Sequence, residues 1–345
     1  MKQQHFHVKF LKGYGFSIKV KDSKLILKNC YDPFLKSDVE EWFVKDMPYQ
    51  RIILQGKGYI STESLLLLSE NNRTVVLLDN RGRQVSFCHG IRDSLTATKY
   101  KIAQYDIFRD KTKRDYLTQQ ILKAKIQSQI RFLKSTGHPE ILQNICKLEK
   151  SGISEAVSSR YYFNNYTKLI DERFGFKKRN SIRIEKNNAT DVINALLNYG
   201  YAVLAGQISA YINGVGLDAY YGFMHKNHTS FQSLVYDVME PFRWLVDYSV
   251  WKLSDAKSCN RISKKQYAHT RDGIVVLEYD LIRKFLELLE RTFQKERQYQ
   301  YRHGAKTRDG LKSVQEITIA KIMVQNLAEF CVGKQKEFRI FTIKE

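Results

Sequence analysis

Residues 56–82 read GKGYISTESLLLLSENNRTVVLLDNRG, a stretch that predicts a turn, a short helix and a strand in succession. The two glycines at 56–58 are a turn signal. Ser61 and Ser64 can cap a helix that contains the leucine run and ends at the two asparagines. The apolar run at 75–78 then indicates a strand. The stretch therefore predicts a β region with one short helix.

The residues on either side of this stretch continue the β pattern. Apolar and polar residues alternate with a period of two in short runs at 6–10, 16–20, 25–27, 51–54 and 84–87. Such runs, separated by polar turns, are typical of strands. The region up to about residue 90 is therefore predicted to be mostly β.

The rest of the chain changes to long, charged segments with helical periodicity, and the whole chain has only 4 prolines. Helices are predicted at 96–109, 112–135, 138–149, 153–170, 188–214, 230–256, 278–303 and 310–330. A length of 345 residues suggests roughly two domains. We therefore predict an α+β protein: a small, mostly-β N-terminal domain (1–90), a linker (91–100) and a larger all-α domain (101–345).

The charge balance points to a polyanionic partner. The chain has 57 Lys and Arg against 36 Asp and Glu, a formal net charge of +21. The excess per residue is similar in the β region and in the helical region, so a folded surface carries it rather than a basic tail. Such a surface favours binding to nucleic acid.

The cysteines and the hydropathy exclude several classes of protein. The five cysteines, at 30, 88, 146, 259 and 331, are widely spaced and include no Cys-x-x-Cys pair. Neither a disulfide framework nor a cysteine zinc site is indicated. No stretch approaches the roughly 18 apolar residues that span a bilayer, and the N-terminus lacks an apolar signal region. We predict a cytoplasmic protein with no membrane partner.

One segment carries residues suited to binding a metal. In GFMHKNHTSFQSLVYDVMEPFRWLVD, His225 precedes a predicted helix that contains Asp237 and Glu240. The two acids are three residues apart and so share a helical face. An imidazole with carboxylates suits a divalent ion, with oxygen ligands favouring Mg²⁺ or Mn²⁺. The alternative is that both acids are solvated helix charges and that His225 is a hydrogen-bonded polar residue.

Spacing alone leaves further interpretations open. His225, His228 and Glu240 could instead form a zinc site. His228, beside Lys226, could equally contact a phosphate. Upstream, Glu155 opens a predicted helix, where an acid interacts favourably with the helix dipole whether or not it belongs to a site.

Three segments together resemble the CRISPR-associated integrase family that carries out spacer acquisition. The first is residues 56–82. The second is Glu155 followed by RYYF at 160–163, and the third runs from NALLNYGYAVLAG through GLDAYYGFMH to SLVYDVMEPFR at 194–243. Weaker similarity occurs in AKIQSQIRFL at 124–133 and at 262–278. The matches follow one another in order, so no single short motif carries the resemblance.

The resemblance implies a set of metal ligands and an architecture. By position, Glu155, His225 and Glu240 would be the catalytic residues that hold Mg²⁺ or Mn²⁺, with Asp237 in support. The N-terminal β domain would form a homodimer, and the helical domain would be catalytic. One departure is Ala219, where the family commonly has proline after aspartate, which puts the geometry of that loop in question.

The resemblance also implies an activity and partners. The protein would be a metal-dependent DNA endonuclease and integrase that inserts foreign fragments into a CRISPR array, through attack of a 3′ hydroxyl on a phosphodiester. This reaction serves antiviral defence. The expected partners are double-stranded DNA and a small ferredoxin-like adaptation protein. Expected DNA contacts are Arg160, Lys226, His228, Arg243, Lys264 and Lys265.

Three alternatives accompany this interpretation. Arg243 could pair with Glu240 or Asp237 instead of contacting DNA. The basic, aromatic segment 296–312 could be a DNA-contacting arm or a solvated helix end. The whole protein could be a transposon-encoded integrase relative, or a non-catalytic nucleic-acid-binding scaffold; the scaffold would require a broken ligand set, whereas this set is intact.

Overall fold

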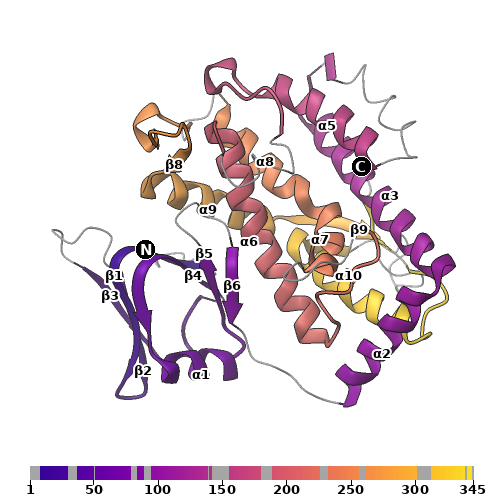
Figure 1. Ribbon diagram of the computed structural model, residues 1–345, viewed down its shortest axis with the longest axis horizontal. Helices are drawn as coiled ribbons and strands as arrows, with labels where there is room; N and C mark the ends of the chain where they lie inside the picture. The colour runs from indigo at the N-terminus through magenta and orange to yellow at the C-terminus, as the bar shows by residue number, and fades with distance from the viewer. Residues whose placement is uncertain are drawn as a thin grey trace. The chain divides into compact units, whose positions relative to one another are not determined.

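The computed structural model groups the chain into two compact units (Figure 1). The first unit comprises Met1–Ile91, Asn180–Gly206 and Ile262–Glu290, and the second comprises Arg92–Arg179, Gln207–Arg261 and Arg291–Glu345. The structure describes residues 8–29, 37–49, 51–78, 84–88, 95–138, 140–141, 155–179, 189–225, 232–255, 261–300, 312–338 and 340–343.

A six-stranded sheet forms the centre of the first unit. Its strands are β1 (Val8–Lys21), β2 (Lys24–Asn29), β3 (Asp38–Trp42), β4 (Arg51–Ile60), β5 (Thr74–Leu78) and β6 (Gln84–Cys88), in the order β3-β2-β1-β4-β5-β6. The pairs β1/β4 and β4/β5 are parallel, and the other pairs are antiparallel. Helix α1 (Thr62–Glu70) connects β4 to β5 and buries Leu68 in the core that includes Ile52 and Leu54 (Figure 1).

The stretch 56–82 folds partly as predicted. The helix is confirmed, since the Ser64 backbone N–H donates to Ser61 Oγ at the start of α1. The turn predicted at 56–58 is wrong, because β4 continues through it. Gly56 lies opposite Gly13 of β1 and has a φ of +119°, and a Cβ there would come within 2.3 Å of the Gly13 carbonyl oxygen. Glycine at position 56 therefore allows two strands to lie close together and does not reverse the chain.

Helical residues later in the chain belong to the first unit as well. They come from α6 (Val192–Val215), α9 (Tyr279–Gln294), η3 (Lys264–Gln266) and the hairpin of β7 (Tyr267–His269) and β8 (Val275–Leu277). The ring of Phe10 contacts those of Tyr199 and Tyr279. Arg51 Nη2 also lies 3.1 Å from Glu290 Oε2 in a buried ion pair. The predicted division of the chain at residues 91–100 stays a prediction.

The second unit is mainly helical, and the predicted α+β class is confirmed. Its elements are α2 (Leu95–Arg109), α3 (Lys111–Ser135), α5 (Glu155–Leu169), η1 (Glu172–Phe174), α7 (Ser233–Met239), η2 (Glu240–Phe242), α8 (Arg243–Ser254), α10 (Glu316–Cys331) and a sheet of β9 (Glu296–Gln300), β10 (Lys312–Gln315) and β11 (Thr342–Ile343). In the core, the Tyr162 hydroxyl donates to Asp247 Oδ2 at 2.6 Å, and the Tyr166 hydroxyl donates to the Asp247 carbonyl at 2.8 Å. Among the described residues, no helix has both the length and the hydropathy to cross a membrane.

Two predicted helices are interrupted. The helix predicted at 230–256 divides into α7, η2 and α8 around Pro241, which lacks an N–H and obstructs regular helical bonding. The helix predicted at 278–303 ends at Gln294, and the next residues form β9. The segment at 296–300 is therefore not a solvated helix end, and Tyr299 within it is buried. Residues 301–311 of the proposed arm lie outside the described residues.

Candidate metal centre

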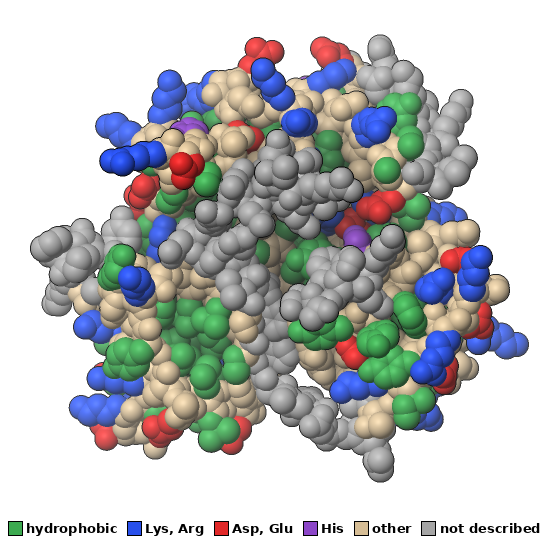
Figure 2. All heavy atoms as spheres, in the orientation of Figure 1, with side chains coloured by type: hydrophobic (Ala, Val, Ile, Leu, Met, Phe, Trp, Pro, Cys, Tyr) green, Lys and Arg blue, Asp and Glu red, His purple; other side chains and the backbone are tan. Residues whose placement is uncertain are grey.

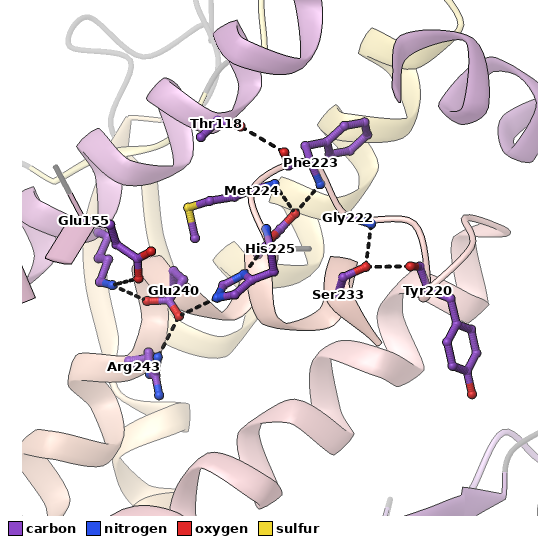
Figure 3. Close-up of polar contacts among 12 residues, drawn as sticks. Thr118, Glu155, Tyr220, Gly222, Phe223, Met224, His225, Ser233, Glu240 and Arg243 are labelled. Carbon is purple, nitrogen blue, oxygen red and sulfur yellow. Dashed lines mark hydrogen bonds and ion pairs between the residues drawn. The ribbon is translucent and has the colours of Figure 1, made fainter. Parts of the chain in front are cut away.

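Asp237 on α7 organises the loop that carries His225. Its carboxylate accepts hydrogen bonds from the backbone N–H groups of Phe223, Met224 and His225. His225 Nδ1 lies 2.7 Å from Asp237 Oδ1 (Figure 3). Asp237 is fully buried, and this one side chain holds both the loop backbone and the imidazole of His225 in place.

The close approach of this loop to α7 requires glycine at position 222. A Cβ on Gly222 would lie 2.6 Å from Asp237 Oδ2 and 2.7 Å from the Ser233 carbonyl carbon. The Gly222 N–H donates to Ser233 Oγ at 2.8 Å, and that hydroxyl donates to the Tyr220 carbonyl at 2.6 Å (Figure 3). The loop is therefore hydrogen-bonded to α7 through both Ser233 and Asp237.

Asp218 holds the start of the loop although alanine follows it. The Asp218 N–H donates to Gln104 Oε1 at 2.8 Å, and Gln104 Nε2 donates to the Asp218 and Tyr221 carbonyls. The Tyr105 hydroxyl donates to Asp218 Oδ2 at 2.7 Å. Contacts from α2 thus supply the restraint that proline would give, which answers the question raised by Ala219.

The structure brings Glu155, His225 and Glu240 together from three separate segments (Figure 3). Glu155 is the first residue of α5, His225 is the last described residue of the loop before the gap at 226–231, and Glu240 begins η2. One potential ligand atom from each lies within 4.8 Å of the other two.

Two cations contact the buried carboxylate of Glu240. Lys125 Nζ on α3 lies 2.7 Å from Glu240 Oε2 and 2.9 Å from Glu155 Oε1. Arg243 Nη1 donates to Glu240 Oε1 at 2.7 Å (Figure 3). Burial alone would raise the pKa of Glu240, but the charges of Arg243 and Lys125 outweigh it and lower this pKa to about 2. The carboxylate is thus held ionised.

Lys125 is the residue of the centre that sequence reasoning missed. A signal was present, because Lys125 follows Leu117 and Ile121 on the buried face of α3, where lysine is unusual. Arg243 is also part of the centre, in the ion pair with Glu240 that had been considered as an alternative to DNA contact.

The environment of His225 favours its protonated form. Burial would lower the pKa of His225, but the hydrogen bond and charge of Asp237, with the charges of Glu240 and Glu155, outweigh it and raise this pKa. A neutral imidazole that donates from Nδ1 to Asp237 would leave Nε2, 3.9 Å from Glu240 Oε1, available as a ligand. Binding of a metal through Nε2 would therefore release a proton at low pH.

The residues present fit a divalent ion. The centre offers two carboxylates and one imidazole without a thiolate, a donor set suited to Mg²⁺ or Mn²⁺. Glu240 Oε2 is buried and forms no well-aligned hydrogen bond, although the Lys125 ammonium lies beside it. The side chains of Glu155 and His225 are 42% and 25% exposed, so water and substrate oxygens can reach the centre.

The predicted DNA contacts lie in several places. Arg160 is exposed on α5, and Lys264 and Lys265 are exposed in η3 of the first unit. Lys226 and His228 lie outside the described residues. In the view of Figure 2, Lys and Arg side chains are scattered over the described part of the surface.

The fold and the centre define a class: α+β proteins with a carboxylate and imidazole centre suited to metal-assisted chemistry on phosphodiesters. The family model of CRISPR associated protein Cas1 matches residues 10–291. A CRISPR-associated endonuclease Cas1 from Archaeoglobus fulgidus is 26% identical over 273 residues, which cover 70% of this chain and 76% of that protein. The chain therefore belongs to the Cas1 family, and it is an enzyme of the CRISPR-associated endonuclease type.

Two solved structures have a similar fold. One, described as a casposase bound to integration product, has a TM-score of 0.82 at 24% identity and covers 98% of this chain and 96% of that one. The other, a Cas6-RT-Cas1–Cas2 complex, has a TM-score of 0.74 at 19% identity. The match to the second covers 99% of this chain and 36% of the longer one.

Proposed function

We propose that this protein inserts short foreign DNA fragments into a CRISPR array. The 3′ hydroxyl of a fragment attacks a phosphodiester of the repeat, so one phosphodiester bond forms as another breaks. The observation that carries the proposal is the convergence of Glu155, His225 and Glu240 in a Cas1-family chain. No side chain needs to act as the nucleophile, because the DNA supplies it.

In this proposal the three ligands hold Mg²⁺ or Mn²⁺. The bound ion supplies Lewis-acid polarisation of the phosphoryl oxygen and stabilises charge on the attacking or leaving oxygen. Asp237 orients the His225 ring through Nδ1, and Arg243 and Lys125 keep Glu240 ionised. These side chains position the ligands before DNA arrives.

DNA binding is proposed to rest on phosphate contacts by basic side chains. Each neutralised phosphate releases counterions, so many Lys and Arg residues contribute to affinity. The exposed Arg160, Lys264 and Lys265 are candidates, together with Lys226 and His228. Arg243, the remaining candidate, is paired with Glu240.

The proposed assembly contains a second copy of this chain and a small ferredoxin-like partner. Large apolar side chains are exposed in the first unit at Tyr14, Tyr59 and Leu66, which supports a protein interface on the β domain. The similar fold of a chain in a complex that includes Cas2 supports a companion of that kind. A fragment of residues 1–90 that is dimeric in solution would agree with an interface there.

A second candidate is a transposon-type integrase that joins its own element's ends to target DNA. The similarity to a casposase bound to its integration product favours keeping it. The two functions differ in substrate and not in centre. Insertion confined to a repeat-containing plasmid supports spacer acquisition, whereas insertion of specific DNA ends irrespective of a repeat supports the second candidate.

The test is a strand-transfer assay with labelled fragments and a repeat-containing plasmid. After chelation, Mn²⁺ or Mg²⁺ should restore transfer, and zinc should not, because zinc prefers tetrahedral sites. His225→Ala should abolish transfer while leaving most DNA affinity. If zinc alone restored transfer and His228→Ala removed it, the rival site of His225, His228 and Glu240 would replace the present assignment.

A further inference from the structure

We propose that Lys125 is a built-in cation of the metal centre, which the metal displaces when it binds. The inference rests on the proposed function, since it concerns the same ligands. It adds that metal loading exchanges one cation for another, so Lys125 weakens metal affinity and stabilises the metal-free protein.

The geometry places the lysine where it would compete with a metal. Lys125 Nζ is within 2.9 Å of one oxygen of Glu155 and within 2.7 Å of one oxygen of Glu240. These carboxylates supply two of the three potential ligands in the centre. The ammonium therefore contacts the same two acids that would help to hold a divalent ion.

Electrostatics explains why a cation is built in. The side chain of Glu240 has no exposure to solvent, and a buried carboxylate without a nearby positive charge is strongly unfavourable. Arg243 supplies one charge to Glu240, and Lys125 contacts both acids. The lysine thus lets the helices α3 and α5 and the segment η2 pack around two carboxylates without a metal.

The same charges make joint occupancy unfavourable. A divalent ion and an ammonium on the same two carboxylates repel each other, and weak screening in the interior increases this repulsion. The lysine side chain is a flexible stem with a compact charge, so its ammonium can move while its helix stays in place. The partly exposed Glu155 and His225 mark the side from which water and the ion reach the centre.

The experiment measures Mn²⁺ binding to the chelator-treated full chain, by the electron paramagnetic resonance signal of free Mn²⁺. Lys125→Met keeps an unbranched side chain, one atom shorter, and removes its charge. Lys123→Met is the matched control, because Lys123 is exposed on the same helix and its loss changes the net charge equally. Lys125→Arg keeps the charge.

We expect the Kd for Mn²⁺ to fall about tenfold in Lys125→Met, which corresponds to about 1.4 kcal/mol. Lys123→Met should bind as the wild type does, and Lys125→Arg should bind no more tightly. Without metal, Lys125→Met should melt at a lower temperature than the wild type, and saturating Mn²⁺ should raise its Tm by more than it raises the wild-type Tm.

The outcomes separate this inference from the proposed function. If the wild type binds Mn²⁺ and His225→Ala does not, but Lys125→Met binds no more tightly than the wild type, only the exchange is overturned. If Lys125→Met stays unfolded even in saturating Mn²⁺, the exchange is also overturned, because the ion should replace the missing charge. If the wild type does not bind Mn²⁺, both proposals fail.

Discussion

Two buried glutamates of the second unit, Glu240 and Glu316, have similar surroundings, but their pKa values are shifted in opposite directions. Each is the first residue of a helical segment, each is 1% exposed, and each has an arginine beside it. Yet the pKa of Glu240 is lowered to about 2, whereas the pKa of Glu316 is raised. Burial of an acid therefore does not by itself identify a functional site.

The partners account for the difference. Glu240 has Arg243 and Lys125, and these charges outweigh its burial. For Glu316, burial outweighs the charge of Arg297 and the hydrogen bonds from Tyr299 and Arg297. Tyr299 belongs to β9, so Glu316 connects the small sheet to α10, whereas Glu240 adjoins two partly exposed ligands. Solvent access and two further potential ligands distinguish the metal centre from the cluster that Glu316 forms with Tyr299 and Arg297.

Replacing each glutamate with glutamine is the strongest test of this contrast. Glu240→Gln removes a charged ligand, so strand transfer should fall by about 100- to 1000-fold or more. Glu316→Gln should leave the initial rate within about threefold, because it removes no ligand. Rates with a labelled fragment provide the measurement. Equal losses in the two variants would remove the distinction.

Asp237→Asn tests whether the orientation of His225 matters. The amide cannot accept all the hydrogen bonds that the carboxylate accepts, so Mn²⁺ affinity should fall by about 10- to 100-fold. Asp247→Asn is the control, since Asp247 is a second buried aspartate of the same unit and accepts hydrogen bonds from Tyr162 and Tyr166. The control should lower the Tm and leave Mn²⁺ affinity unchanged. Unchanged Mn²⁺ affinity in Asp237→Asn would mean that the loop positions His225 without it.

Gly222→Ala tests the close approach of the loop to α7. The added methyl would meet Asp237 and the Ser233 backbone, so we expect a loss of about 1–3 kcal/mol in the free energy of unfolding. Gly214→Ala in α6 has nothing within 4 Å of its new Cβ and should gain up to about 1 kcal/mol. Urea unfolding of both variants provides the comparison. A neutral Gly222→Ala would show that the loop can move away from α7.

The smallest expected effect concerns the pH dependence of Glu316. Its pKa in the folded protein is raised above the ordinary value of 4.5, so the folded state binds more protons than the unfolded state above that pH. The stability of the wild type relative to Glu316→Gln should therefore fall as pH rises above 4.5. Urea unfolding of both proteins in the presence of a chelator measures this difference in the free energy of unfolding. If the stability of the wild type relative to Glu316→Gln rose with pH instead, the pKa of Glu316 would be lowered in the folded protein, as that of Glu240 is.

The sequence alone predicted the features that depend on neighbouring residues. Ser61 caps α1 through Ser64, and the alternation in residues 16–20 predicts a strand, because side chains of a strand face opposite sides in turn. The ordered family segments also named Glu155, His225 and Glu240, whose convergence the structure supports. The family resemblance indicates which residues far apart in the chain lie close together, and no local sequence pattern contains that information.

Tertiary structure decided what depends on distant partners. Gly56 is strand and not turn because Gly13 lies opposite it, and residues 296–300 are strand because 312–315 and 342–343 pair with them. Lys125 occupies an unusual position for a lysine on the apolar face of its helix, but only the fold shows Glu155 and Glu240 around its ammonium. Strand pairing and the neutralisation of buried charge are contacts between residues far apart in the chain, so only the folded structure determines them.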